Sequence, residues 1–306
     1  MQTFKVGQCD VHDFSAPEEE GFDFDCVSTS TRPNVKICIF NDDEDIYVSK
    51  RLRSWGAWER HLTTAISQLM GFYSDPTFVD IGANLGIHSL VVAKLGFRVI
   101  AVEPQHECIR RLVRSVKLNG MQEDIVLVKN VVFNARQKLN LNLADDNKGA
   151  ASVHFSFDDT QSTNSIILDD LLDVILPEDG PQLSNDVILK LDIQASEYKA
   201  LMNSTQFFRR LNVRAIIMEW EEMRRLLRDP TFKDKDLIMR MVANLRRMGY
   251  VAYSMETYLK KSNDGAELSD ADLLSPLINI AWVKDDVFIS VDSKANVVID
   301  KIVLEV

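Results

Sequence analysis

The sequence has no apolar run long enough to cross a membrane. Met1 is also not followed by the basic and apolar regions of a signal peptide. For the chain as written, we therefore expect a soluble, cytoplasmic protein without a membrane span. A location in the lumen of the secretory pathway stays open, because the chain can also be the trimmed part of an anchored protein.

Positive charge is scarce as well. The 306 residues include 35 Lys and Arg against 46 Asp and Glu, which gives a formal net charge of -11. An acidic surface repels the phosphates of nucleic acids, so we expect no nucleic-acid partner. Hydrophobic residues make up 46% of the chain, which is enough to build a core. The length of 306 residues fits one large domain or one domain with an appendage. The oligomeric state is not predicted.

Cysteines are few, and no pair has the spacing of a metal site. The four lie at Cys9, Cys26, Cys38 and Cys108, with no CxxC or CxxH among them, so we expect no bound metal. The first three are close in the sequence. They either form one disulfide in an oxidising compartment or remain reduced thiols in the cytosol.

The chain divides into an extension and a main domain. Residues 1–75 are expected to be an N-terminal extension. It begins with a poorly ordered lead or strap over 1–35, continues with short strands at 35–40 and 45–49, and ends in an amphipathic packing helix over 58–72. Residues 76–306 are expected to form the main domain.

In the main domain, short apolar strands alternate with amphipathic helices. This alternation predicts a parallel sheet covered on both faces, a Rossmann-like, doubly wound α/β fold. The last two strands, 250–255 and 278–283, have no helix between them, so we expect an antiparallel end to the sheet. Residues 256–277 are expected to be a loop, and 134–164 an irregular stretch with short strands. The expected parallel strands are 77–81, 98–103, 124–132, 186–193 and 213–220.

The stretch FVDIGANLGIHSL, residues 78 to 90, joins the first strand to the first helix through a glycine-containing turn. Gly82 and Gly86 allow the backbone to turn tightly and to approach a ligand. Glu103 follows after about 20 residues, where dinucleotide-binding sites place an acid on ribose hydroxyls. The middle glycine of that fingerprint is replaced by Asn84, whose side chain crowds a pyrophosphate.

A nucleoside without a pyrophosphate suits this turn. S-adenosylmethionine offers a ribose for Glu103, an amino-acid end for the backbone of the turn, and a sulfonium for Asp80. Asn130, at the end of the third strand, is either an adenine contact or a turn residue. The expected cofactor-binding residues are Asp80, Gly82, Ala83, Asn84, Gly86, Glu103, Pro104 and Asn130.

Several segments together resemble the FkbM-type methyltransferases, a branch of the class I S-adenosylmethionine-dependent methyltransferases. They are FVDIGANLGIHSL, VIAVEP, RLVRSVKLNG, SIILDDLL and ILKLDIQASEYKAL, in the family's order and covering roughly residues 78–220. The resemblance implies a seven-stranded, mostly parallel sheet with an antiparallel final strand. It also implies methyl transfer, usually to an oxygen of a sugar or natural product. Gln194 and Ala195 depart from the family's usual Glu and Gly.

Charged residues near the ends of later strands are the candidates for catalysis. Lys190 and Asp192 share one face of an otherwise apolar strand, so they meet either each other or a ligand. A hydroxyl acceptor must lose its proton, and a carboxylate, Asp192 first, is the favoured base. A divalent cation held by Asp192 and Glu219 would also activate a hydroxyl, but the spacing does not require one. The candidate catalytic residues are Asp192, Glu197, Glu219, Lys190 and His88.

We therefore predict an O-methyltransferase that acts on a hydroxyl of a small-molecule or glycan acceptor. N-methylation is the alternative among enzymes. A catalytically inactive nucleoside-binding or scaffold protein is the alternative outside them, and Gln194 and Ala195 are the features that point to it. A dinucleotide-dependent dehydrogenase is disfavoured by Asn84 and by the lack of a second fingerprint.

Overall fold

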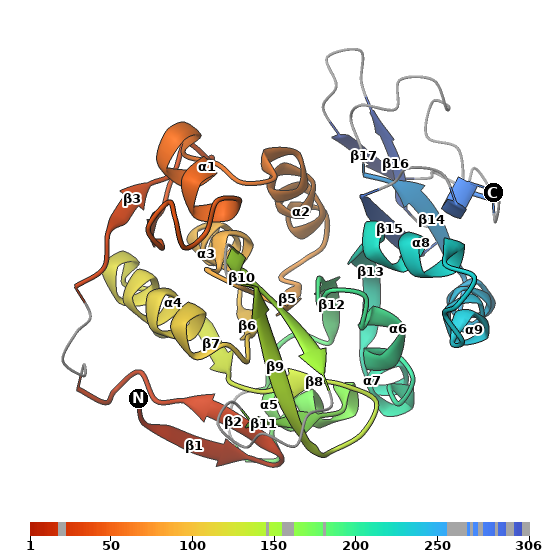
Figure 1. The fold of residues 1–306 in the computed structure, drawn as a ribbon, viewed down its shortest axis with the longest axis horizontal. Helices are drawn as coiled ribbons and strands as arrows, with labels where there is room; N and C mark the ends of the chain where they lie inside the picture. The colour runs from red at the N-terminus through yellow and green to blue at the C-terminus, as the bar shows by residue number, and fades with distance from the viewer. Residues whose placement is uncertain are drawn as a thin grey trace.

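The computed structural model describes residues 1–17, 23–144, 147–154, 162–179, 182–255, 268–269, 272–274, 278–284, 287–291 and 297–301. Its central sheet has nine strands in the order β1-β2-β7-β6-β5-β12-β13-β15-β14 (Figure 1). The parallel centre consists of β7 (Ile125–Val128), β6 (Val99–Val102), β5 (Thr77–Ile81), β12 (Asp186–Leu191) and β13 (Asn212–Glu219). The predicted α/β fold with a mostly parallel sheet is confirmed.

β15 (Asn279–Lys284) is the last strand of this sheet in the sequence and lies between β13 and β14 (Tyr250–Ser254). It is antiparallel to both. This confirms the predicted antiparallel end. Of the loop predicted over 256–277, most lies outside the described residues, and Asp272–Leu274 forms the short 3-10 helix η3.

The first edge of the sheet differs from the prediction. β1 (Thr3–Val6) and β2 (Cys9–His12) form a hairpin that extends the seven expected strands to nine. Val11 pairs with Val128 of β7, and Cys9 and Val11 are buried. The expectation of a poorly ordered lead is therefore wrong for residues 3–12, because the hairpin completes the edge of the sheet.

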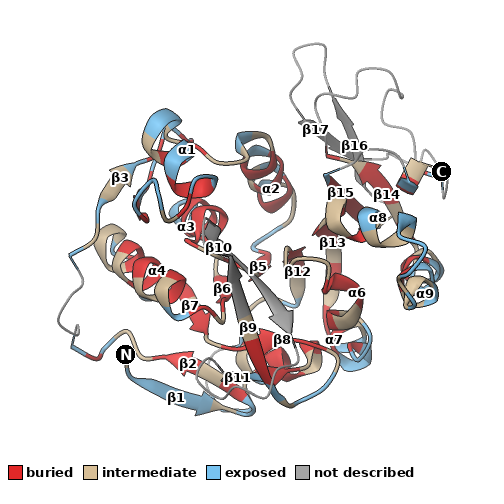
Figure 2. Cartoon of the chain, in the orientation of Figure 1, coloured by how far each residue is buried: buried red, intermediate tan, exposed pale blue. Residues whose placement is uncertain are grey.

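Buried residues lie along the central strands (Figure 2). Alternate residues of these strands belong to two separate apolar cores. All of β5 is buried: Phe78 belongs to one core, whereas Val79 and Ile81 belong to the other. The first core contains residues of α1 (Val48–Trp55), α2 (Arg60–Phe72), α3 (Ile87–Lys94) and α4 (His106–Asn119). The second contains residues of η2 (Leu168–Leu171), α5 (Leu172–Ile175), α6 (Glu197–Ala200), α7 (Thr205–Arg210), α8 (Glu221–Arg228) and α9 (Lys235–Arg247).

The N-terminal segment contributes to the first core. β3 (Cys26–Ser28) and β4 (Lys36–Cys38) form an antiparallel pair, and a disulfide joins Cys26 to Cys38. The strand predicted over 45–49 is wrong, because α1 begins at Val48. The Asp45 carboxylate accepts the N–H groups of Val48 and Ser49 at 3.0 and 2.8 Å, and so starts the helix instead.

A second sheet forms mainly from the stretch predicted to carry short strands. Its order is β10-β9-β11-β8, with β8 at Val131–Val132, β9 at Lys138–Ala144, β10 at Asn147–His154 and β11 at Ser162–Ile166. The single strand predicted over 124–132 is wrong, because its first part is β7 of the central sheet and its end is β8 of the second sheet. A C-terminal hairpin joins β16 (Val287–Val291) and β17 (Val297–Lys301). Among the described residues, no helix is long and apolar enough to span a membrane.

Candidate active site

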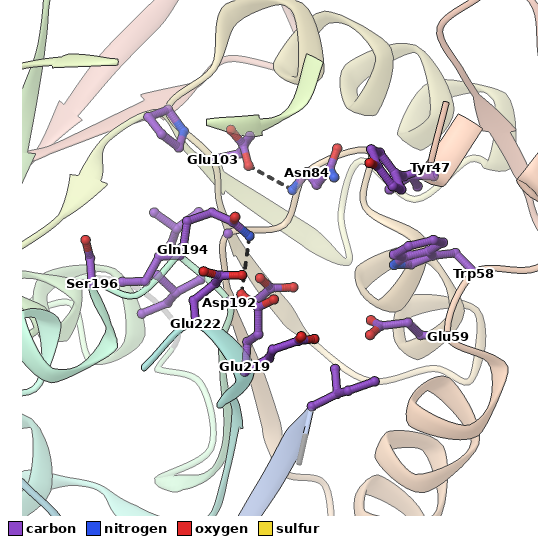
Figure 3. Close-up of a pocket in the computed structure, with 18 of the residues that line it drawn as sticks. Tyr47, Trp58, Glu59, Asn84, Glu103, Asp192, Gln194, Ser196, Glu219 and Glu222 are labelled. Atoms are coloured by element: carbon purple, nitrogen blue, oxygen red, sulfur yellow. Dashed lines mark hydrogen bonds between the residues drawn. The ribbon is translucent and has the colours of Figure 1, made fainter. Parts of the chain in front are cut away.

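A cavity of about 740 Å³ opens at the carboxyl ends of β5, β6, β12 and β13 (Figure 3). This is the edge at which open α/β sheets bind ligands. Of the residues predicted from the sequence, seven line it: Gly82, Asn84, Glu103, Pro104, Asn130, Asp192 and Glu219. The other six, Asp80, Ala83, Gly86, His88, Lys190 and Glu197, are not among the lining residues.

The turn after β5 requires glycine at two positions. Gly82 has φ +79°, and a Cβ there would lie 1.9 Å from the carbonyl oxygen of Asp192. Gly86 has φ +84°, and a Cβ there would lie 2.3 Å from Cδ1 of Leu112. Asn84 between them is also left-handed, with φ 53°. The backbone of Gly82 therefore packs directly on the end of β12, and the turn presents its other side to the cavity.

Glu103 follows β6 and is held by the backbone. Its Oε2 accepts the N–H of Asn84 and its Oε1 accepts the N–H of Gln105, each at 2.8 Å. Burial raises the pKa of Glu103 to about 7, although these two hydrogen bonds oppose the shift. Each carboxylate oxygen retains a second lone pair that can accept a ligand hydroxyl.

Beneath the turn, Lys190 and Asp80 form a buried ion pair. Lys190 Nζ lies 3.2 Å from Asp80 Oδ1, 3.5 Å from Asp192 Oδ2 and 3.3 Å from the carbonyl oxygen of Gly82. Burial alone would lower the pKa of Lys190, but the carboxylates of Asp80, Asp192 and Glu59 outweigh it and raise the pKa above its ordinary value. Lys190 is therefore a permanent cation, unsuited to act as a base.

Asp192 and Glu219 meet at the floor of the cavity (Figure 3). Burial, together with Asp192 and Glu197, raises the pKa of Glu219 to about 10. Glu219 Oε2 also accepts a hydrogen bond of 3.2 Å from Nε2 of Gln194. At neutral pH Glu219 is therefore a neutral acid and a proton donor. The neighbouring Asp192 Oδ2 lies 3.5 Å from the ammonium of Lys190.

Gln194 and Ala195, where the sequence departs from the family pattern, both have left-handed backbones. Their φ angles are 54° and 64°. A side chain in this region is strained, and glycine is the residue that adopts it without cost. Gln194 lines the cavity, where its amide donates a hydrogen bond to Glu219.

Three predicted residues have clear partners within the chain. Asn130 Oδ1 accepts the N–H of Asp10 at 2.7 Å, and its Nδ2 donates to Asp10 Oδ2 and to the carbonyl of Asn164. Glu197 is fully buried, and its Oε1 accepts the N–H of Ile193 at 2.8 Å. His88 belongs to α3, and its Nδ1 lies 3.1 Å from Oγ1 of Thr63 in α2. Of the three, only Asn130 lines the cavity.

Glu59 was missed by the sequence analysis. It precedes α2 with φ 40°, and its carboxylate lines the cavity opposite Glu219 (Figure 3). Oε1 accepts a 3.2 Å hydrogen bond from Asn279 Nδ2, and Oε2 lies 3.6 Å from Nε2 of His88. Burial would raise the pKa of Glu59, but His88, Lys190 and Asn279 together bring it below its ordinary value.

An aromatic wall, also missed, lines the cavity from α1 and the turn before α2. It consists of Tyr47, Trp55 and Trp58. The guanidinium of Arg51 lies 5.7 Å from the ring centroid of Trp55 and 5.1 Å from that of Trp58. Trp55 is 68% exposed, so a large flat apolar face is available at the cavity mouth. Within the described part of the chain, no cluster of three or more potential metal ligands is found.

Comparison with known proteins agrees with this architecture. The model of the methyltransferase FkbM domain matches residues 80–252, more than half of the chain, which confirms the resemblance seen in the sequence. No match is found among curated proteins. Among solved structures, the O-methyltransferase TomG from Streptomyces achromogenes, involved in tomaymycin synthesis and in complex with SAM, is similar at 12% identity and TM-score 0.43, over 74% of this chain and 82% of that one. The O-methyltransferase from Bacillus cereus in complex with SAH is similar at 12% identity and TM-score 0.41, over 74% and 83%.

Proposed function

The chain belongs to the FkbM methyltransferase family, and on this basis we propose that it transfers the methyl group of S-adenosylmethionine to a hydroxyl of a sugar, glycan or similar small acceptor. The observation that carries the proposal is the shared cavity. It places the Gly82 turn and Glu103 on one side and the Asp192–Glu219 pair on its floor. A cofactor region and a proton-accepting region thus face the same enclosed space.

The residues present fit the cofactor. Substituting Gly82 or Gly86 would place a Cβ against Asp192 or Leu112, so the glycines fix the shape of the turn, which presents Gly82 and Asn84 to the cavity. Glu103 is fixed by two backbone N–H groups and suits two adjacent ribose hydroxyls. Asp80 is the exception to the expected set. It lies under the turn, paired with Lys190, and would act on a sulfonium through the field of the pair rather than by contact.

Little further chemistry is needed from the chain. When bound, S-adenosylmethionine supplies a methyl group already activated by its sulfonium. Asp192 would accept the proton that the acceptor hydroxyl loses as its oxygen takes the methyl group from sulfur, with S-adenosylhomocysteine as the leaving group. The ammonium of Lys190 lies 3.5 Å from the Asp192 carboxylate, and the neutral Glu219 donates a hydrogen bond that orients the acceptor. The walls hold the acceptor in line and exclude water.

The aromatic wall supports a sugar as the acceptor. A sugar ring has apolar C–H faces and a polar rim of hydroxyls. Trp55 and Trp58 offer flat faces on which the C–H faces of a sugar can stack. Glu59 and Arg51 offer groups that can hydrogen-bond to its hydroxyls. The cavity of about 740 Å³ has room for an acceptor beside a nucleoside.

The test is a calorimetric titration with S-adenosylmethionine, followed by a screen of mono- and oligosaccharides for release of S-adenosylhomocysteine. We expect micromolar cofactor binding and turnover with at least one sugar. Asp192→Asn should keep cofactor binding but lower kcat by about 100- to 10,000-fold. A folded native protein that does not bind S-adenosylmethionine would contradict the proposal, and so would an Asp192→Asn variant of unchanged kcat.

A further inference from the structure

A second cavity, of about 680 Å³, lies between α6–α7 and α9. Its floor is apolar and its lining is rich in methionine and aromatic side chains. Met202 and Met248 are exposed by 46% and 40%, although both are large apolar residues. The apolar lining residues are Tyr198, Leu201, Met202, Phe208, Leu237, Met241, Leu245 and Met248. We call this feature the α9 groove.

The α9 groove is elongated. Leu237, Met241, Leu245 and Met248 are spaced by three or four residues, so they form one stripe along α9. At about 1.5 Å per residue, the stripe follows the helix for roughly 16 Å, or about three turns. Met241 and Leu245 are already packed in the second apolar core, whereas Leu237 and Met248 at the two ends of the stripe are partly or fully exposed. An occupant that contacts both ends must therefore extend along α9. Methionine-rich grooves of this kind adapt to helical ligands.

The charges at the α9 groove are of one sign. Its charged lining residues are Arg209, Arg240 and Arg247, and no acidic residue is among the lining residues described. This local positive charge contrasts with the net charge of -11 of the chain. Arg240 and Arg247 are seven residues apart on α9, which separates them by about 10 Å along the axis. A row of carboxylates on a partner helix, spaced by one or two turns, matches this separation.

From these observations we propose that the α9 groove docks an amphipathic helix of a protein partner, with acidic side chains flanking an apolar stripe. The apolar stripe of the partner would cover Met202, Leu237 and Met248, which are exposed or partly exposed, and its acids would meet the three arginines. None of these residues lines the cavity of the candidate active site. The proposal therefore does not depend on methyl transfer.

The experiment measures binding of two fluorescent model peptides to the full chain by anisotropy. Both peptides are about 16 residues long and carry leucines at i, i+3, i+4 and i+7. Glutamates flank the leucines in one peptide and lysines replace them in the other. We expect the glutamate peptide to bind at least about tenfold more tightly than the lysine peptide. Glu103→Ala should leave this difference unchanged.

Two double variants with reversed charges distinguish an effect of the α9 groove on peptide binding from an effect of the total charge of the protein. Arg240→Glu with Arg247→Glu should weaken the glutamate peptide by about tenfold or more and favour the lysine peptide. Lys50→Glu with Lys94→Glu changes the total charge equally at exposed positions outside the groove and should have little effect. Equal binding of both peptides, or equal loss in both double variants, would overturn the proposal. Binding to phosphatidylcholine–phosphatidylglycerol vesicles but to neither peptide would also overturn it and indicate a lipid instead.

Discussion

Lys190 and Asp80 occupy paired positions on β12 and β5, and their charged groups lie 3.2 Å apart with 3% and 0% of the side chains exposed. The second oxygen of Asp80 accepts a 2.7 Å hydrogen bond from Ser89 Oγ of α3. Lys190 also donates to the carbonyl oxygen of Gly82 and lies near Asp192. One ion pair thus joins two central strands, the glycine turn and the proposed base.

Because the pair is buried, removing one partner leaves an uncompensated charge. We expect Lys190→Met to lower the free energy of unfolding by about 3–5 kcal/mol at pH 7, measured by urea denaturation. The double variant Asp80→Asn with Lys190→Met removes both charges and should lose clearly less than Lys190→Met alone. Equal stability of the single and double variants would show that Asp80 and Lys190 do not act as a pair.

Glu103 provides a test of the cofactor region. Replacing it with Ala removes a charged hydrogen-bond acceptor, so we expect S-adenosylmethionine to bind about 10- to 100-fold more weakly by calorimetry. Glu123→Ala, an exposed glutamate on the turn before β7, is the matched control and should leave the affinity unchanged. Since Glu103 also holds the backbone at Asn84 and Gln105, the thermal midpoint of each variant must be measured with the titration. A Glu103→Ala protein that is folded and of native affinity would exclude the ribose contact.

The left-handed backbone at Ala195 predicts a stabilising substitution. With φ 64°, Ala195 is strained, and Ala195→Gly should raise the free energy of unfolding by about 1 kcal/mol. Ala243→Gly makes the same chemical change at an exposed position inside α9, where it should cost about 1 kcal/mol instead. Urea denaturation of both variants checks the opposite signs. If Ala195→Gly is also destabilising, the strain at this position is not real.

Local patterns predicted the centre of the fold well. The apolar runs of β5 and β6, the glycines between β5 and α3, and the acid after β6 all lie close together in the sequence, so spacing alone placed them. The hairpin at 3–12 was not predictable in this way. Its place depends on the pairing of Val11 with Val128 and on the hydrogen bonds between Asp10 and Asn130, which join residues far apart in the chain.

In the candidate site, too, local sequence predicted some residues and missed those whose place depends on distant contacts. Glu103, Asp192 and Glu219 were found because each lies at the end of an apolar strand. Glu59 was missed because it belongs to the N-terminal segment and reaches the cavity through contacts with His88 and Asn279. A glutamate before an amphipathic helix has no local signal that separates it from an ordinary surface residue. The register of β12 with β5, which pairs Lys190 with Asp80, was equally invisible in the sequence.

Glu197 predicts a pH dependence of stability. Burial raises its pKa to about 8, even though its Oε1 accepts the backbone N–H of Ile193. Its Oε2 is buried and has no hydrogen-bond partner among the described residues. The folded protein therefore keeps a proton that the unfolded chain releases near its ordinary value of 4.5. Between these two values the folded state binds more protons, so stability falls as the pH rises.

Glu197→Gln removes this titration and keeps an oxygen for Ile193. We expect native protein and variant to have similar free energies of unfolding near the lower end of the window. As the pH rises towards about 8, the native protein should lose up to about 1.4 kcal/mol per pH unit relative to the variant. Glu178→Gln, at an exposed position, should follow the native curve throughout. Parallel curves for native protein and Glu197→Gln would mean that Glu197 is already ionised in the folded state, and that a solvent or protein donor satisfies its second oxygen.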